Sequence, residues 1–149
     1  MKTLILNILV IVPVLGWGQT FEKTVNFDIE LSSLSNPEVV REVANDGRII
    51  ILEGLLRDIR AEKNDTKTTL WITLIGGEWI GTSEVRAYTC RVKFSNNEWL
   101  EIFTETAQEN ANTGNMMLGN RMLVAARVIG INSEDQVAEL EMVDYRVLK

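Results

Sequence analysis

Few residues in this 149-residue chain could carry out catalysis. It has no His and a single Cys, Cys90. A nucleophilic Ser or Cys needs a neighbouring base, which is most often His. A pair of carboxylates could still do acid–base work. Glu139 and Glu141 share one face of a strand pattern, but this spacing is typical of a solvent-exposed strand face. We therefore expect no enzyme activity and no catalytic residues.

Metal and thiol chemistry have little support. Asp58, Glu62 and Asp65 cluster around an expected hairpin and offer the oxygen ligands that divalent cations prefer. No dense Asp-x-Asp-x-Asp-Gly run accompanies them, so we expect no metal and no other cofactor. Cys90 alternates with Tyr88 and Val92, which favours burial as a small hydrophobic residue over a reactive thiol or a disulfide between chains.

Recognition is the chemistry that the remaining residues favour. The candidate ligand-binding side chains are Trp71, Trp79, Tyr88, Arg86, Arg91 and Lys93. Aromatic rings stack on nucleic acid bases while basic groups attract phosphates. Trp79 is flanked by glycines in an expected loop, residues 78–84, where it could anchor a protein partner. Alternatively, Trp79 folds over the end of the domain and Tyr88 belongs to the core face.

The charge balance bears on the partner. With 15 Lys and Arg against 21 Asp and Glu, the net charge is −6. Proteins that hold nucleic acid by phosphate neutralisation carry a basic stripe, so nucleic acid is disfavoured although still possible. An anionic membrane surface is disfavoured for the same reason. The excess of acid favours a basic protein partner.

The N-terminus has the pattern of a signal peptide. Lys2 precedes an apolar run, residues 4–15, and Gly16 and Gly18 stand at −3 and −1 of a cut before Gln19. About 12 apolar residues are too few to span a bilayer. We expect residues 1–18 to be removed, leaving a periplasmic or secreted chain with no membrane span.

Hydrophobic periodicity predicts the elements that position these side chains. Residues 19–35 form an N-terminal leader in which apolar and polar residues alternate. This leader either forms a strand or lies over the surface of the domain. Asn36, Pro37 and Gly47 predict a short helix between them. The pattern then predicts strands over residues 48–59, 69–75 and 85–94, an amphipathic helix over residues 98–108, and strands over residues 121–131 and 137–148.

This order predicts a mainly β, five-stranded OB-fold, a Greek-key barrel. One short helix precedes strand 1 and another lies between strands 3 and 4. Gly54, in the middle of the first strand, is typical of a bulge or a sharp bend. The single domain spans residues 36–149. An open meander is the alternative, whereas a lipocalin-like barrel needs eight strands and a longer chain.

Residues 48–148 resemble the small bacterial OB-fold proteins grouped as tRNA-anti-like. The shared features are the first strand with its central Gly54, the strand over residues 88–94, and the closing segments over residues 123–130 and 140–145. Tyr145 departs from the pattern, because such domains often carry a small residue there. The resemblance implies the OB-fold and a binding role, without naming a ligand.

These observations together predict an exported, non-catalytic OB-fold binding module. A protein or peptide is the expected ligand. The alternative is a single-stranded nucleic acid or an oligosaccharide held on the barrel face.

Overall fold

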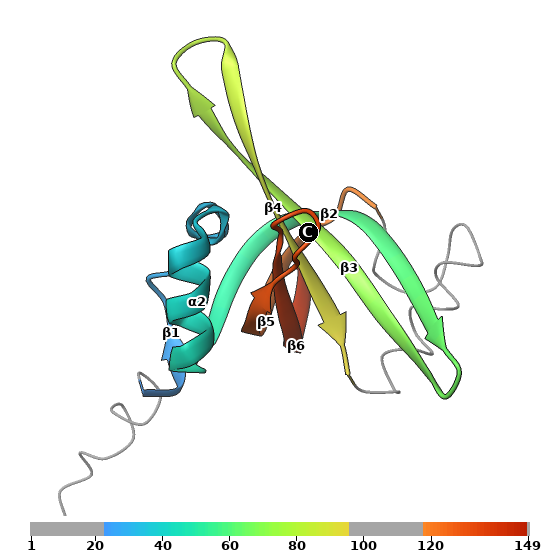
Figure 1. Ribbon diagram of the computed structural model, residues 1–149. Coiled ribbons are helices and arrows are strands. Elements are labelled where there is room, and N and C mark those ends of the chain that lie inside the picture. Colours follow the sequence, from blue (N-terminus) through green and yellow to red (C-terminus); the bar gives the residue numbers. More distant parts are fainter. Residues whose placement is uncertain (1–22, 96–117, 149) are drawn as a thin grey trace, which may run out of the picture.

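The computed structural model describes residues 23–95 and 118–148. Its elements in chain order are β1 (Val25–Asn26), the 3-10 helix η1 (Leu31–Ser35), α2 (Pro37–Asp46), β2 (Ile49–Asn64), β3 (Lys67–Ile80), β4 (Glu84–Phe94), β5 (Arg121–Ile131) and β6 (Ala138–Leu148). Figure 1 shows the curved strands wrapped into a barrel, with η1 and α2 together on one side.

The five long strands form a closed barrel. Neighbouring strands pair in the order β2, β3, β4, β6, β5, and β5 then pairs with β2 to close the sheet. All pairs among them are antiparallel except β4 with β6, which is parallel. The short β1 adds to β2 in parallel. The predicted OB-fold is therefore confirmed. The helix predicted over residues 98–108 lies outside the described residues.

Strand alternation fills the barrel. On β3, Leu70, Ile72 and Leu74 are buried, whereas the residues between them are partly exposed. The same alternation on β4 buries Cys90 and Val92. Because successive side chains point to opposite faces of a strand, one set fills the interior and the other faces outward. The expected burial of Cys90 is confirmed.

The helix before the barrel begins and ends where the sequence predicts. Asn36 is the N-cap of α2, and its Oδ1 accepts a hydrogen bond from the backbone N–H of Glu38 at 3.0 Å. Gly47 is the C-cap, with a left-handed φ of 70°. The amphipathic helix buries Val40 and Val43 in the same core as the barrel strands.

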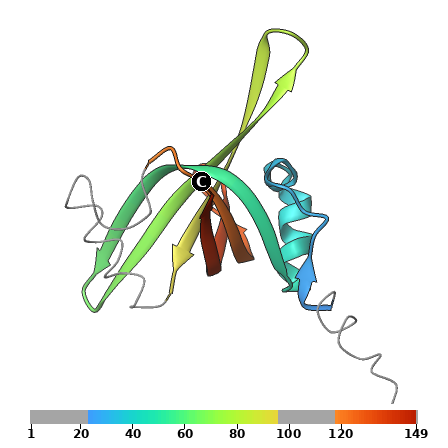
Figure 2. The same ribbon diagram turned by 180° about the vertical axis from the view of Figure 1, so that it is seen from behind.

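The N-terminal segment joins that core as well. Leu31 and Leu34 of η1 are buried and belong to the core cluster of the barrel. The strand-like alternation predicted for residues 19–35 is realised as strand only in β1, because the chain then turns into η1. Figure 2 shows β1, η1 and α2 beside the N-terminal half of β2.

Both of the first two hairpins are longer than predicted. The charged residues between the predicted strands 48–59 and 69–75 belong mostly to strands themselves. Strand β2 continues to Asn64, and β3 starts at Lys67. Gly76 and Gly77 do not break β3, which runs on to Ile80 in register with β4. The loop predicted for residues 78–84 is therefore wrong. The end of β3 and the start of β4 are paired there and form an arm that projects from the barrel in Figures 1 and 2. We call it the β3–β4 arm.

The irregularity in the first strand lies just after the glycine. Gly54 pairs regularly with Met122 of β5, whereas the register shift lies between Leu56 and Asp58. Strand β2 leaves β5 and joins β3 at Leu55, so the bend expected near Gly54 marks the change of partner. A Cβ at Gly54 would lie 3.2 Å from the Cβ of Leu74, which shows how closely the strands approach there.

Candidate ligand-binding face

The outward-facing residues of β3 and β4 bring three of the predicted binding residues together. Trp71 and Lys93 are direct cross-strand partners, and Thr73 and Arg91 form the next pair on the same face. All four side chains are partly exposed. On the other side of β3, Arg60 of β2 is the cross-strand partner of Trp71. The strands thus place an indole ring between cationic neighbours on two sides.

A groove of about 440 Å³ runs over this face and under the connection between β5 and β6. Trp71 and Thr73 of β3 line it together with residues of the neighbouring strands β2 and β4. Its lining residues are Arg57, Asp58, Arg60, Glu62, Trp71, Thr73, Thr89, Arg91, Asn132, Glu134, Val137 and Glu139. We call this the outer groove. In OB-folds the face of strands 2 and 3 and the loops beside it bind oligonucleotides and oligosaccharides; here those strands are β3 and β4.

Hydrogen bonds hold the polar groups of the outer groove in place. Trp71 donates from Nε1 to Oε2 of Glu62 at 3.1 Å, and Asn132 donates from Nδ2 to Oε1 of Glu139 at 2.8 Å. Arg60 and Asp58 form an ion pair with 2.6 Å between Nε and Oδ2, and Arg91 pairs with Asp135. The indole, the amide and the ionic groups are therefore positioned before any ligand arrives.

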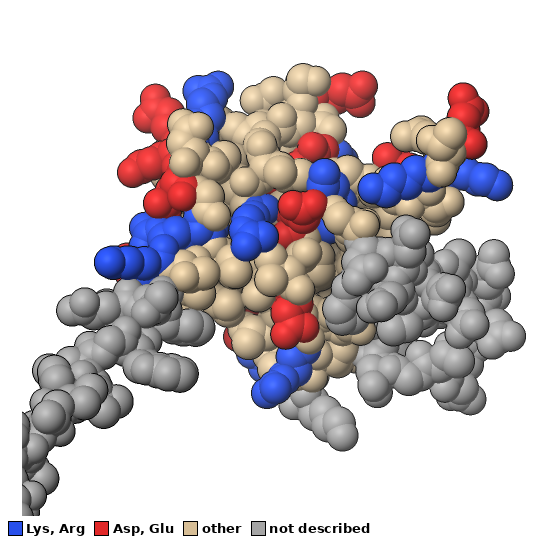
Figure 3. All heavy atoms as spheres, turned by 90° about the horizontal axis from the view of Figure 1, so that it is seen from below, with Lys and Arg blue, Asp and Glu red and all other residues tan. Residues whose placement is uncertain are grey.

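The electrostatics of the outer groove are mixed rather than basic. Its lining includes three guanidinium groups, from Arg57, Arg60 and Arg91. Four carboxylates accompany them, from Asp58, Glu62, Glu134 and Glu139. Figure 3 likewise shows acidic and basic side chains interspersed over the face in view. The groove therefore offers hydrogen-bond donors and acceptors in similar numbers, without the basic stripe that tracks a phosphate backbone.

The other three predicted residues lie elsewhere. Trp79 and Arg86 are on the β3–β4 arm, where Trp79 pairs with Val85 and is 71% exposed. Tyr88 lies at the base of the arm and donates a hydrogen bond from its hydroxyl to Oε2 of Glu78 at 2.9 Å. The six residues therefore do not form one site. Only Trp71 and Arg91 line the outer groove, and Lys93 lies beside Trp71 without lining it.

The two carboxylates that are candidates for catalysis, Glu139 and Glu141, have separate hydrogen-bond partners. Glu139 accepts from Asn132 and Glu141 accepts from the Ser95 hydroxyl, so they are held separately. Within residues 23–95 and 118–148, no three His, Cys, Asp or Glu side chains are grouped to hold a metal ion. Burial raises the pKa of the Cys90 thiol to about 12, which keeps it protonated and unreactive. No helix in these ranges is long and apolar enough to cross a membrane.

Several outer-groove residues were missed from the sequence. The sequence pattern predicts that the strand ends at residue 59, which excludes Arg60 and Glu62, whereas both lie on β2 after the bulge and face outward. Asn132 and Glu134 come from the turn between β5 and β6, whose position beside β3 depends on barrel closure. The signal for these β2 residues is the alternation of polar and apolar residues, which continues through residues 58–62. No local sequence pattern indicates that the turn between β5 and β6 lies beside β3.

No protein-family model matches the chain, and no curated protein matches its sequence. Similar solved structures include the small single-stranded DNA-binding protein of Streptomyces coelicolor, with TM-score 0.48, 10% identity, and coverage of 68% of this chain and 93% of that one. The mitochondrial single-stranded DNA-binding protein Rim1 of S. cerevisiae has TM-score 0.47, 13% identity, and coverage of 69% and 95%.

A third similar structure, the Plasmodium falciparum SSB in complex with ssDNA, has TM-score 0.43, 16% identity, and coverage of 68% and 94%. Likeness at these values concerns the strand arrangement and carries no argument about the ligand of this chain. The OB-fold follows from the strand order and barrel closure described above. Membership of the tRNA-anti-like group stays a prediction.

Proposed function

We propose that this protein is a non-catalytic binding module that holds an oligosaccharide in the outer groove. The observation that carries the proposal is the position of Trp71 in the lining of a polar groove, on the face that OB-folds use for polymeric ligands. The sequence alone favours a protein or peptide ligand anchored by Trp79. We propose an oligosaccharide for the outer groove instead, because Trp79 does not line it.

The chemistry of the lining suits a sugar. Sugar hydroxyls both donate and accept hydrogen bonds, so they need carboxylates as acceptors and guanidinium or amide groups as donors. The outer groove offers both kinds, including Arg60, Arg91, Asn132 and Glu139. The exposed part of the Trp71 indole adds an apolar, rigid surface for the C–H face of a sugar ring. Concave sites with an aromatic wall and a few fixed polar groups are typical for small ligands.

Single-stranded nucleic acid is the second candidate, and the pairing of Trp71 with Lys93 favours it. An indole beside a cation is the arrangement that stacks a base and attracts its phosphate. Against it, Arg60 and Arg91 are already paired with Asp58 and Asp135. Those carboxylates neutralise part of the positive charge and repel a phosphate, so we rank nucleic acid below the oligosaccharide.

Export remains part of the proposal, and it rests on the signal-like pattern of residues 1–18. An exported protein meets the polysaccharides of an envelope more often than free nucleic acid. The intact mass of the chain recovered outside the cytoplasm tests this step, with the expected form beginning at Gln19. A chain recovered only in the cytoplasm with residues 1–18 attached would contradict it.

The experiment for the ligand is titration of the full chain with defined oligosaccharides and, separately, with an oligothymidine. Isothermal titration calorimetry reports binding without relying on the tryptophan that one variant removes, and each titration is run at about 50 mM and about 500 mM salt. Oligosaccharide binding should change less than about twofold with salt, because no counterions are released. Nucleic acid binding should weaken by orders of magnitude.

Two variants locate the ligand. Trp71→Ala should weaken binding at least about tenfold, which corresponds to about 1.4 kcal/mol. Trp79→Ala is the matched control, because it removes an exposed Trp on the arm and should leave binding unchanged. Salt-sensitive binding of the oligothymidine alone would replace the oligosaccharide with nucleic acid. Equal loss in both variants, or none in either, would overturn the assignment to the outer groove.

A further inference from the structure

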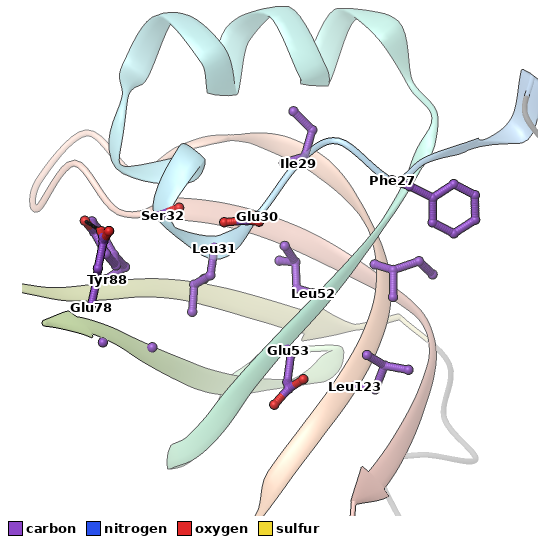
Figure 4. Close-up of a pocket in the computed structure, with 13 residues that line it drawn as sticks. Phe27, Ile29, Glu30, Leu31, Ser32, Leu52, Glu53, Glu78, Tyr88 and Leu123 are labelled. Carbon is purple, nitrogen blue, oxygen red and sulfur yellow. Dashed lines mark hydrogen bonds between the residues drawn. The ribbon is translucent and has the colours of Figure 1, made fainter.

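A second concavity lies on the other side of the β3–β4 arm, between the N-terminal segment and the barrel. Its volume is about 530 Å³. Figure 4 shows η1 above it and strands β2 and β3 spreading apart below. Its lining residues are Phe27, Ile29, Glu30, Leu31, Ser32, Ile51, Leu52, Glu53, Gly76, Gly77, Glu78, Tyr88 and Leu123. We call it the acidic cleft.

The acidic cleft joins apolar surface to negative charge. Phe27 is 59% exposed and Leu123 is 36% exposed, although both are large apolar side chains. Glu30, Glu53 and Glu78 contribute three carboxylates, and none of the described lining residues is a Lys or Arg. Such a lining is complementary to a ligand with both cationic and apolar groups.

Nearby arginines neutralise only part of the negative charge of the acidic cleft. Arg121 binds Glu53, with 3.0 Å between Nε and Oε1. Arg86 is the cross-strand partner of Glu78 on the arm but does not line the cleft. The hydroxyl of Tyr88, rather than a cation, donates to Glu78. Among the described residues neither Glu30 nor Glu78 forms an ion pair, so each can receive a cation from outside.

Strand edges supply a second, independent indication. Strand β3 pairs with β2 only as far as Ile75, so from Gly76 to Ile80 its described strand partner is β4 alone. Strand β2 pairs with β1 at Ile49 and Ile50 and with β3 from Leu55 onward. Between those points no described strand covers that side of β2. Unpaired edges of this kind accept an extended peptide as an added strand.

We propose that the acidic cleft binds an extended basic segment of a partner protein, with alternate cationic side chains directed to Glu30 and Glu78. The backbone of the segment pairs with the edge of β3 at residues 76–80, where Gly76 and Gly77 present no bulky side chain. Apolar residues of the segment contact Phe27 and Leu123. This site is separate from the outer groove and does not depend on the oligosaccharide proposal.

A fluorescently labelled, end-blocked heptapeptide of alternating lysine and valine tests the proposal by anisotropy with the full chain. A glutamate–valine peptide of the same length is the charge control, and a lysine–valine peptide N-methylated at alternate residues is the backbone control. We expect binding of the first peptide only. Absence of its binding, or equal binding of the N-methylated peptide, would overturn the proposed strand addition.

Variants separate the cleft from general attraction to an acidic protein. The double variant E30Q/E78Q should weaken binding of the lysine–valine peptide by at least about tenfold. The double variant E42Q/E84Q changes the net charge equally at exposed positions outside the cleft, and it should change binding less than about twofold. Equal weakening in both would overturn the site. Trp71→Ala should leave peptide binding intact, so failure of this proposal is distinguishable from failure of the oligosaccharide proposal.

Discussion

Trp71 and Glu62 are joined across the outer face of the barrel, where the indole Nε1 of β3 donates to Oε2 of β2 at 3.1 Å. The two residues are not direct cross-strand partners, since Trp71 lies opposite Arg60 and Glu62 lies opposite Thr69. The bond therefore runs diagonally between the two strands. It leaves the indole face, rather than its N–H, as the group presented to a ligand.

Removal of the acceptor should release the indole. In Glu62→Ala the resonance of the Trp71 indole N–H is expected to move upfield, because its charge-assisted hydrogen bond is lost. Glu62→Gln should keep most of the shift, since an amide oxygen still accepts. Two-dimensional ¹H–¹⁵N NMR measures this, with Trp71→Phe identifying the signal. Identical spectra for the alanine variant and the parent would contradict the bond.

A side chain at Gly76 should force Leu31, which lies over it, to move. A Cβ at Gly76 would lie 2.9 Å from Cδ2 of Leu31, closer than real contacts allow. Gly76→Ala should lower the free energy of unfolding by about 1–2 kcal/mol, as measured by urea denaturation. Gly130→Ala is the control, since its Cβ would meet nothing within 4 Å.

A double-mutant cycle checks the cause of that loss. Leu31→Ala alone should destabilise by about 2–4 kcal/mol through the cavity that it leaves. In its background Gly76→Ala should be nearly neutral, because the clashing atom is gone. Additive effects of the two substitutions would show that Leu31 does not cause the strain.

The buried thiol should make stability fall at alkaline pH. The pKa of Cys90 rises from 9.0 to about 12 through burial, so the folded chain keeps the thiol neutral while the unfolded chain ionises it. Below pH 9 both states hold the proton and the effect vanishes. Between pH 9 and 12 the free energy of unfolding should fall by about 1.4 kcal/mol per pH unit from this group.

Urea denaturation at several pH values, compared with Cys90→Ala, isolates that contribution from other titrating groups. The variant should lose less stability between pH 9 and pH 10.5 than the parent. Iodoacetamide should label the native parent at pH 8 far more slowly than the urea-unfolded chain. Parallel pH profiles for parent and variant would refute the assignment.

The N-cap residue of α2 should contribute more to the stability of the fold than a polar residue inside the helix. Asn36→Ala removes the acceptor of the 3.0 Å bond from the Glu38 N–H and should cost about 1 kcal/mol. Asn45→Ala changes the same residue type at an exposed position inside the helix and should be neutral or slightly stabilising. Thermal unfolding of the two variants measures the difference.

Local sequence signals determined the helix ends and most strand cores. Asn36, Pro37 and Gly47 act within one turn of the chain, so capping rules place α2 without tertiary information. Alternation likewise predicted the inward Cys90 and the outward Arg91 and Lys93, because the period of two is a property of the strand itself. The strand order then followed from counting elements and led to the OB-fold.

Tertiary structure alone decided where the strands stop and which side chains meet. The two glycines at 76 and 77 are weak strand formers, yet β3 passes through them because pairing with β4 satisfies the backbone. Leu31 becomes core only because β2 and β3 diverge beneath it. Barrel closure brings the turn of Asn132 beside Trp71, some sixty residues away in sequence. Such long-range contacts depend on register between distant strands, which no local pattern encodes.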